Sequence, residues 1–188
     1  MANISAIGIK KLYYGDPIAA VTKAVEEGDA TSGYSALELK ALIPTLTEVK
    51  NVHGDTWNYE EAEANITRYK NQLTGKPYRQ DSEAGETQIS FTIGQYDYKT
   101  KADLQGGVAT ASSWSRPAGA VDIRKTVVAL TNDDIYILMP NAAIVGRGAT
   151  TDNAIGLAVG ATAMEPTVEG LEIEKWFDKK AVDEAAAG

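Results

Sequence analysis

Few residues in the chain could support catalysis, and the first of them is the single histidine, His53. It lies in 51–55, a stretch typical of a turn, where a histidine is more often a surface residue than a general base. The glycines of Gly146-Arg147-Gly148 begin a dinucleotide-binding fingerprint, but Thr151 stands where the third glycine belongs. We therefore expect no catalytic residue, no enzymatic activity and no cofactor.

The composition also restricts metal sites. The chain has no cysteine and only one histidine, which excludes disulfides, cysteine-based metal sites and histidine clusters. Glu60, Glu61 and Glu63 could coordinate Ca²⁺ in principle, but they lack the alternating spacing of a calcium loop. A solvated acidic face is the expected role of these carboxylates, and we expect no metal.

The segment 51–86 carries charge in blocks. Five acids and one base occur between positions 48 and 63, whereas positions 65–80 hold four bases and no acid. Aromatic residues interleaved with charge are typical of contact surfaces, and a basic arm on an acidic body could bind a neighbouring copy. The candidate contact residues are Trp57, Tyr59, Arg68, Tyr69, Lys70, Lys76, Tyr78 and Arg79. The alternative is a solvent-exposed hairpin that binds nothing.

Length and charge bound the class of protein. The chain has 188 residues, of which 44% are hydrophobic and 23% are charged. This composition is typical of a globular protein, and the length is sufficient for one hydrophobic core. A net charge of −8 argues against binding nucleic acid by neutralising its phosphates. No apolar run is long enough for a membrane span, and no signal segment opens the chain, so we expect assembly in the cytosol without a membrane partner.

Several segments show clear periodicity. Alternation predicts a strand over 88–93, and a first strand is expected over 4–14. Strands over 123–130 and 135–139 flank the turn-forming residues 131–134, which predicts a hairpin. Residues 97–105 predict one or two helical turns that end at Gly106-Gly107.

Other segments are less regular. From Ser35 to Ile43 the apolar residues recur with a period of two, which predicts a strand. Asp16-Pro17 is a helix-start signal, so we expect a short helix over Pro17–Glu27, with a loop as the alternative.

One late strand, Ala154–Thr162, has large side chains on one face, whereas the other face carries alanine and glycine from position 154 to position 160. Such a bare face lets another group approach closely. Either a bulky neighbour in the sandwich or a second subunit could cover it.

These elements predict a mainly β fold, a β-sandwich or barrel-like domain with one or two short α-helices. We expect a single domain over residues 1–166 with a long inserted loop or hairpin at about 51–86. Residues 167–188 are expected to form a C-terminal arm or tail, in which 171–177 could add a strand. Trp176 and Phe177 are its candidate contact residues.

The order of these elements resembles that of the major tail (tail tube) proteins of long-tailed bacteriophages, or of a prophage-encoded relative. The likeness covers most of the chain. It rests on Ile4–Tyr14, on Gln88–Ile93 with Tyr98–Gly107, on the hairpin Val127–Pro140, on Ile137–Ala142 as a strand-to-loop exit, and on Gly156–Pro166 as the last strand.

This resemblance implies a virion structural subunit that forms hexameric rings, which stack into a hollow tube. Its partners would be copies of itself and other tail proteins, and the genome would pass through without specific binding. The segment 51–86 sits where a long loop reaches between rings, and the bare-faced strand could belong to the sheet that lines or closes the ring. In this reading the acidic charge keeps DNA from adhering.

Two other readings remain open at this stage. A β-sandwich module that binds carbohydrate or protein would use exposed tyrosine and tryptophan equally well. Another tail part, such as a connector or a tube-terminating protein, would share the fold and the chemistry.

Overall fold

The computed structural model describes residues 5–26, 29 and 32–186, and within them the chain is mainly β. The strands are β1 (Lys11–Gly15), β2 (Thr47–Glu48), β3 (Asn58–Glu61), β4 (Asn65–Lys70), β5 (Pro77–Glu83), β6 (Thr87–Ile93), β7 (Val108–Ala109), β8 (Trp114–Ser115), β9 (Ile123–Leu130), β10 (Ile135–Thr151), β11 (Ala154–Ala163) and β12 (Lys175–Asp178). The helices are α1 (Ala36–Leu42), α2 (Tyr98–Gln105) and α3 (Lys179–Glu184), and a 3-10 turn η1 (Ile43–Thr45) follows α1.

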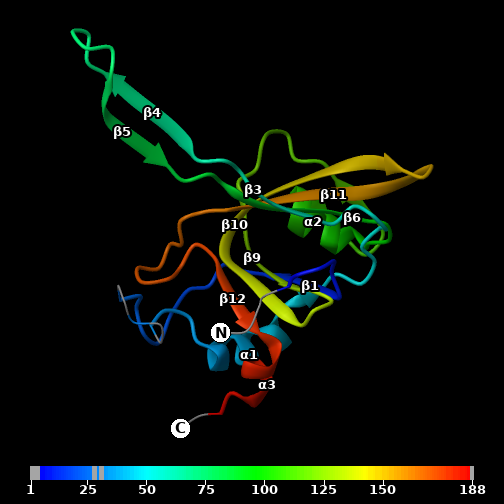
Figure 1. Cartoon of the computed structure of the whole chain (residues 1–188). Coiled ribbons are helices and arrows are strands. Elements are labelled where there is room, and N and C mark those ends of the chain that lie inside the picture. Colours follow the sequence, from blue (N-terminus) through cyan, green and yellow to red (C-terminus); the bar gives the residue numbers. More distant parts are fainter. Residues whose placement is uncertain (1–4, 27–28, 30–31, 187–188) are drawn as a thin grey trace.

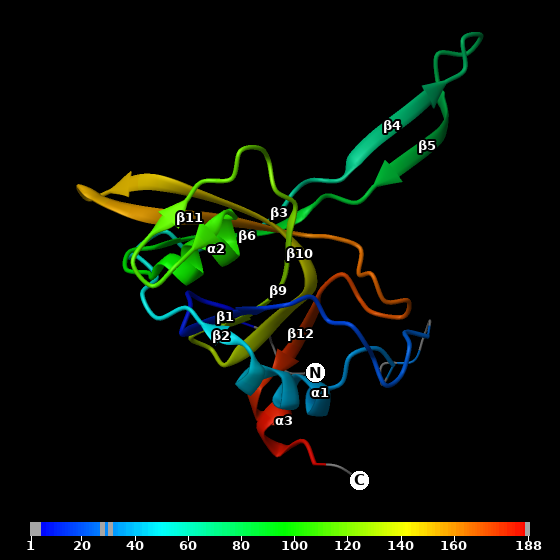
Figure 2. The same ribbon diagram turned by 180° about the vertical axis from the view of Figure 1, so that it is seen from behind.

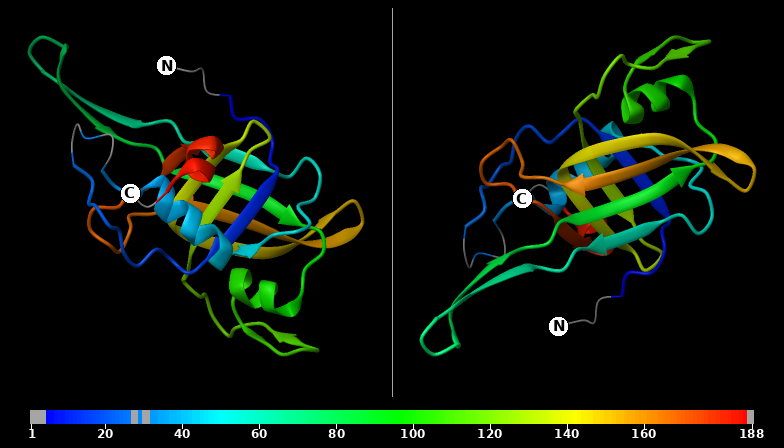
Figure 3. Two further views of the ribbon diagram at one scale, coloured as in Figure 1. Left: turned by 90° about the horizontal axis from the view of Figure 1, so that it is seen from below. Right: turned by 90° about the horizontal axis from the view of Figure 1, so that it is seen from above.

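One eight-stranded antiparallel sheet forms the body, in the order β2-β1-β9-β10-β11-β6-β3, with β12 paired to the first part of β10. The long strand β10 belongs to both halves of this sheet, because its register shifts at a bulge between Met139 and Ala142. A bulge bends the strand that carries it. The sheet therefore curls on itself into a sandwich-like, partly closed body (Figures 1 and 3).

The main core lies inside this curl. Its buried side chains come from both halves of the sheet, and include Leu12, Val127 and Met139 from one half and Phe91 and Leu157 from the other. On β11, Leu157, Val159 and Ala161 are buried in this core, whereas Ile155, near the turn, is 72% exposed. Burial of the large side chains fixes the register of β11, because a slip by one residue would turn them to the outer face.

A second cluster packs on the other face of the β9 and β10 hairpin, beneath α1 and α3. Buried residues of the sheet, such as Val128 and Leu138, meet Leu39 of α1 and Val182 of α3 there. Figure 2 shows the two short helices side by side below β12 and β1. The C-terminal segment is thus part of the folded body.

The periodic segments form the elements that their patterns predict. The alternating segment 88–93 is β6, the hairpin over 123–139 is β9 and the start of β10, and 154–162 is β11. Helix α2 begins where Asp97 caps it, accepting a hydrogen bond from the Thr100 backbone N–H at 2.7 Å. The mainly β, sandwich-like fold class is confirmed, with three short α-helices in the described residues instead of one or two.

The strand expected over Ser35–Ile43 is wrong, because this segment forms α1 and η1. Ser35 and Glu38 make a capping box, in which each side chain accepts from the other residue's backbone N–H. Such a box satisfies two donors at the helix start and favours a helix over a strand. Leu39 is then the buried residue, whereas Leu37 is 39% exposed.

The helix expected over Pro17–Glu27 is also wrong for residues 17–26, which form bends and loop, the alternative reading; Glu27 lies outside the described residues. Distant groups take the backbone donors of this segment. The N–H of Ile18 donates to Pro140 O at 3.2 Å, that of Thr22 to Glu38 Oε1 at 2.7 Å, and that of Val25 to Gly170 O at 2.9 Å. Donors used in this way cannot form helical hydrogen bonds.

Two strand boundaries differ from expectation. The first strand begins at Lys11, although the Lys10 N–H still donates to Leu130 O; Ile4 lies outside the described residues. The strand-to-loop exit expected at Ile137–Ala142 is wrong, because β10 continues through Pro140 as far as Thr151. Besides the Ile18 N–H, the Thr126 hydroxyl donates to the carbonyl of Pro140, at 2.8 Å, which supports the bend.

Candidate functional site

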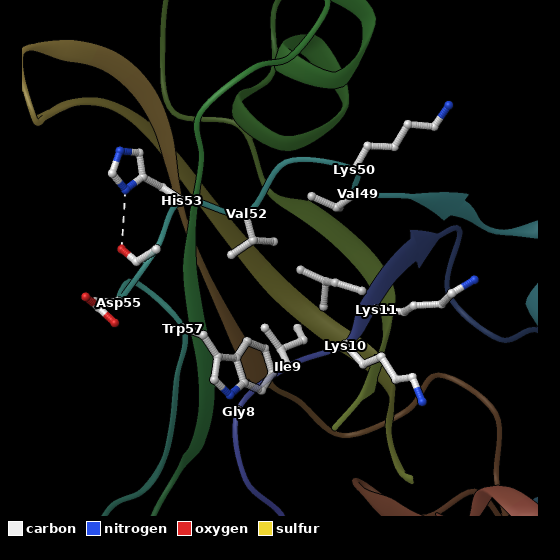
Figure 4. A pocket seen from close by; sticks show the side chains of 12 residues that line it. Gly8, Ile9, Lys10, Lys11, Val49, Lys50, Val52, His53, Asp55 and Trp57 are labelled. Carbon is white, nitrogen blue, oxygen red and sulfur yellow. Dashed lines mark hydrogen bonds between the residues drawn. The ribbon is translucent and has the colours of Figure 1, made fainter. Parts of the chain in front are cut away.

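The surroundings of His53 show no arrangement for nucleophilic catalysis. Its ring lies between the carbonyl of Gly54, 3.3 Å from Nδ1, and the carboxylate of Asp152, 3.5 Å from Nε2. It borders a groove of about 460 Å³ with an apolar floor of Ile9, Val52 and Trp57 and with lysines along the rim (Figure 4). The contact between His53 and Asp152 joins the turn before β3 to the turn between β10 and β11.

The glycine motif and the glutamates considered in the sequence lie in separate parts of the fold. Gly146-Arg147-Gly148 lies within β10, not in a phosphate-binding loop, and Glu60, Glu61 and Glu63 are exposed on and beyond β3. Among the described residues, no group of three or more histidine, aspartate or glutamate side chains is placed to hold a metal ion. Nor does that part of the chain contain a helix of the length and hydropathy that a membrane span requires.

The charged segment forms a hairpin of β4 and β5 that projects from the body (Figures 1 and 2). These two strands pair with each other and, within the described residues, with no other strand. Every residue from position 60 to position 80 is exposed. A lone two-stranded hairpin is only marginally stable in water.

Six of the eight candidate contact residues lie on this hairpin: Arg68, Tyr69, Lys70, Lys76, Tyr78 and Arg79. Its own side chains stabilise the pairing in only two places. The Arg79 guanidinium lies 5.5 Å from the centre of the Tyr69 ring and 2.9 Å from Asp81, and Arg68 donates to Gln80 at 3.1 Å. Exposed ion pairs of this kind contribute little to stability.

The tip of the hairpin exposes apolar surface. Leu73 is 95% exposed and Tyr78 is 71% exposed. The turn is well formed, because Asn71 Oδ1 accepts from the Leu73 N–H at 2.8 Å and Gly75 takes a positive φ of 66°. The defined turn thus presents an exposed leucine between β4, which carries Arg68 and Lys70, and β5, which carries Arg79, Asp81 and Glu83.

The remaining two candidates of this segment, Trp57 and Tyr59, lie in the body, not on the hairpin. Both are partly buried against the main core. Tyr59 donates its hydroxyl to Glu174 at 3.0 Å, and its ring meets that of Trp176 edge to face. Burial, followed by the nearby Glu174 carboxylate, raises the pKa of Tyr59.

The two C-terminal candidates lie on β12. Trp176 is 37% exposed and covers Tyr59, whereas Phe177 packs against the cluster beneath α1 and α3. Both residues therefore make contacts within the chain. Trp176 alone keeps a substantial exposed surface.

The sheet itself presents a feature that sequence reasoning did not find. Strands β10, β11, β6 and β3 form a four-stranded region in which every adjacent pair is antiparallel. Beyond Ile144, β10 extends past the end of β9, so residues 145–151 pair on one side only. At the other side of the region, β3 pairs only with β6. Within the described residues, this region therefore has two edges without a strand partner, which we call open edges, although the last residues of α2, Leu104 and Gln105, lie against Gly146 of β10.

The outer face of this region carries the small residues of β11. Ala158 and Gly160 lie between the polar side chains of β6 and the exposed side chains of Val145 and Arg147 on β10. A Cβ on Gly156 would lie 2.6 Å from the Thr92 methyl carbon, so a neighbouring strand in the same sheet occupies part of the bare face. Figure 3 shows the outer face from above, with the strands foremost.

No protein-family model matches the sequence, and a comparison with curated proteins gave no match.

Proposed function

We propose that this chain is a structural subunit that assembles with copies of itself into rings, which stack into a hollow tube of the kind found in long-tailed phages. The observation that carries the proposal is the pair of open edges on the four-stranded region, β3 on one side and residues 145–151 of β10 on the other. Unpaired strand edges are sites at which another chain adds its own strand.

The direction of the strands favours head-to-tail addition. Because β10, β11, β6 and β3 alternate, β3 of one copy and β10 of the next would also run antiparallel. A contact between two different edges of identical subunits is heterologous, and it closes into a ring when the rotation per subunit allows. The resemblance stated above implies six subunits per ring.

The projecting hairpin supplies a contact in a second direction. Its exposed leucine and tyrosine and its four basic residues have no partner surface on the body of their own copy in the described structure. A hairpin of this kind would join one ring to the next. The same hairpin would serve a connector or a tube-terminating ring, which contacts a neighbouring ring on one side only.

The acidic composition suits a channel for DNA. Each subunit has a net charge of −8, so a ring of identical copies is strongly negative. Such a wall repels phosphate groups, although salt screens the effect over ~8 Å at physiological ionic strength. We expect a negative channel to let DNA pass without adhering.

Negative-stain electron microscopy and sedimentation over a range of protein concentrations test this proposal. The parent chain is expected to form rings or tubes, whereas Val145→Lys, which places a charge at the open edge of β10, should reduce ring formation at least tenfold. Val108→Lys is the matched control, because Val108 is 71% exposed and Val145 is 69% exposed. Val108 lies on β7, outside the four-stranded region.

A parent chain that stays monomeric at every concentration would overturn the proposal. That result would favour the binding-module reading, with Tyr69 and Tyr78 as its exposed aromatic residues. A screen of carbohydrate ligands would then follow. Equal loss of assembly in Val145→Lys and Val108→Lys would instead show that the β10 edge is not the ring contact.

A further inference from the structure

Two grooves adjoin the segment that leads from β6 into α2. The first, of about 510 Å³, lies between this segment and β2 with the residues that follow it. The second, of about 730 Å³, lies between the same segment, the β7–β8 turn and the start of β11. Gln95, Tyr96 and Asp97 line both grooves. The two grooves are therefore neighbours, and together we call them the double groove.

Hydrogen bonds hold the backbone around the double groove. The Gly94 N–H donates to Asn51 O at 2.9 Å, which joins the segment after β6 to the segment after β2. Asp97 caps α2, because its carboxylate accepts from the Thr100 N–H at 2.7 Å. The lining is thus preformed, as the sites that bind small molecules usually are.

The charges in the double groove balance one another. Its described lining holds two carboxylates, Glu48 and Asp97, and two lysines, Lys50 and Lys99, so their formal charges sum to zero in a chain with a net charge of −8. Because attraction and repulsion offset each other, neither an anion nor a cation gains much from this lining.

Contacts just outside the lining keep this balance. Lys99 Nζ lies 2.5 Å from an oxygen of Asp103, and Glu48 lies 3.7 Å from Lys11 Nζ. These two pairs bring one further carboxylate and one further lysine, which again cancel. The charge pattern therefore favours an uncharged ligand.

The uncharged polar side chains suit a ligand that carries hydroxyl groups. Asn51 and Gln95 have amides that can both donate and accept, and Asn51 Nδ2 lies 3.4 Å from Gln95 Oε1. Three threonine hydroxyls complete the polar lining: Thr47, Thr100 and Thr110. A hydroxyl also donates and accepts, so it can bond to either end of an amide.

The second groove adds an apolar platform. Tyr98 and Ile155, which are 44% and 72% exposed, both line it. The ring of Tyr96 is less available, because the Lys101 ammonium lies 5.9 Å from its centre and its hydroxyl donates to Ile155 O at 3.5 Å. Tyr98 is therefore the aromatic ring on which a ligand can pack.

We propose that the double groove binds a neutral saccharide, with one sugar ring packed on Tyr98 and with its hydroxyls bonded to Gln95 and Asn51. A sugar ring combines an apolar face of C–H groups with a rim of hydroxyls, and the double groove presents a partner for each.

This site goes beyond the proposed function. Among the described residues, neither β3 nor residues 145–151 line the double groove, so it lies outside the strands assigned to the ring contact. Saccharide binding can therefore be measured on the isolated chain, independently of whether the chain assembles.

NMR titration of the isotope-labelled chain with defined oligosaccharides tests the proposal. The probes are tetramers of glucose, mannose, galactose and N-acetylglucosamine, with a tetramer of galacturonic acid as the charged comparison. At least one neutral tetramer is expected to shift the amide signals of Gln95, Tyr98 and Ile155. The galacturonic acid tetramer should bind at least tenfold more weakly than that neutral tetramer.

Substitutions then locate the site. Tyr98→Ala and Gln95→Ala should each weaken binding at least tenfold, whereas Tyr98→Phe, which keeps the ring, should retain it. Tyr69→Ala is the matched control, because Tyr69 is 43% exposed and lies on the hairpin. This variant should bind as the parent does.

Three results would overturn the proposal. They are no binding of any neutral tetramer, equal or tighter binding of the galacturonic acid tetramer, and loss of binding in Tyr69→Ala but not in Tyr98→Ala. None of them bears on ring formation, which electron microscopy tests separately.

Discussion

The rings of Tyr59 and Trp176 meet edge to face, with centroids 5.6 Å apart and planes at 84°. Glu174 joins them, because its carboxylate accepts hydrogen bonds from the Tyr59 hydroxyl and from the Trp176 indole N–H. Tyr59 lies on the edge strand β3 and Trp176 on β12. Tyr59, Glu174 and Trp176, which we call the clamp, therefore link the base of the hairpin to the C-terminal strand β12. This strand belongs to the other part of the sheet.

The clamp predicts measurable coupling. Tyr59→Phe removes the hydroxyl donor to Glu174 and should lower the free energy of unfolding by about 1–2 kcal/mol. Tyr59→Ala, which also removes the ring, should give a coupling of roughly 1 kcal/mol with Trp176→Ala in a double-mutant cycle. Urea unfolding measures both, and Tyr98→Phe, at an exposed tyrosine, is the control. Strictly additive changes would contradict a clamp.

The cap of α1 gives a second expectation. Ser35→Ala removes the side chain that accepts from the Glu38 N–H, and a lost N-cap costs about 1 kcal/mol. The urea concentration at the unfolding midpoint should fall, and the slope of the unfolding free energy against urea concentration should stay the same. Ser112→Ala, in an exposed turn, should leave the midpoint unchanged. Equal effects of the two substitutions would mean that the capping box contributes nothing.

Glu38 should make stability depend on pH. Burial alone would raise the pKa of this carboxyl, but hydrogen bonds from Thr22 and Ser35 outweigh it and lower the pKa below its usual 4.5. The unfolded chain therefore binds the proton more readily, so the stabilisation is present above pH 4.5 and is lost as the pH falls through the folded-state pKa.

Glu38→Gln is expected to lower the free energy of unfolding at pH 7, and the difference from the parent should shrink as the pH falls below 4.5. Chemical denaturation at a series of pH values measures this difference. Glu169→Gln, at an exposed acid, is the control. If the difference in unfolding free energy between Glu38→Gln and the parent does not change with pH, the charge of Glu38 does not contribute to stability.

The hairpin should be separable from the fold. The N–H of Ala62 donates to Glu86 O at 2.9 Å, so the strands are already adjacent at its base. Replacing residues 65–83 by Asn-Gly, which favours a tight turn, should change the free energy of unfolding by less than about 0.5 kcal/mol. The same variant should lose ring stacking in electron microscopy. A large loss of stability would show that the hairpin supports the body.

Local patterns in the sequence determined a good part of this fold. Alternation over 88–93 and 154–162 predicted two buried strands, because one face of each must be apolar to join the core. Asp97 and Gly106 marked the two ends of α2, since a cap acts within one turn of its helix. The order of the predicted elements identified the mainly β class, and the charge blocks identified 51–86 as a distinct segment.

Other parts did not follow from hydrophobic periodicity. The apolar spacing over 35–43 fits a strand as well as a short helix, and the capping box of Ser35 and Glu38, a local signal, distinguished them. Residues 17–26 gave their backbone donors to Pro140, Glu38 and Gly170, which no local signal predicts.

The candidate contact residues also depended partly on the sequence and partly on the tertiary structure. The sequence determined which residues are basic, aromatic or small, but not that Trp57 and Tyr59 lie in the body while Arg68 and Arg79 project from it. Only the tertiary structure decided that β10 extends beyond β9, so that the four-stranded region has one open edge at β10 and another at β3. Strand order and edge exposure follow from which distant segments pair, and the free energy of that pairing belongs to the whole sheet and not to any one strand.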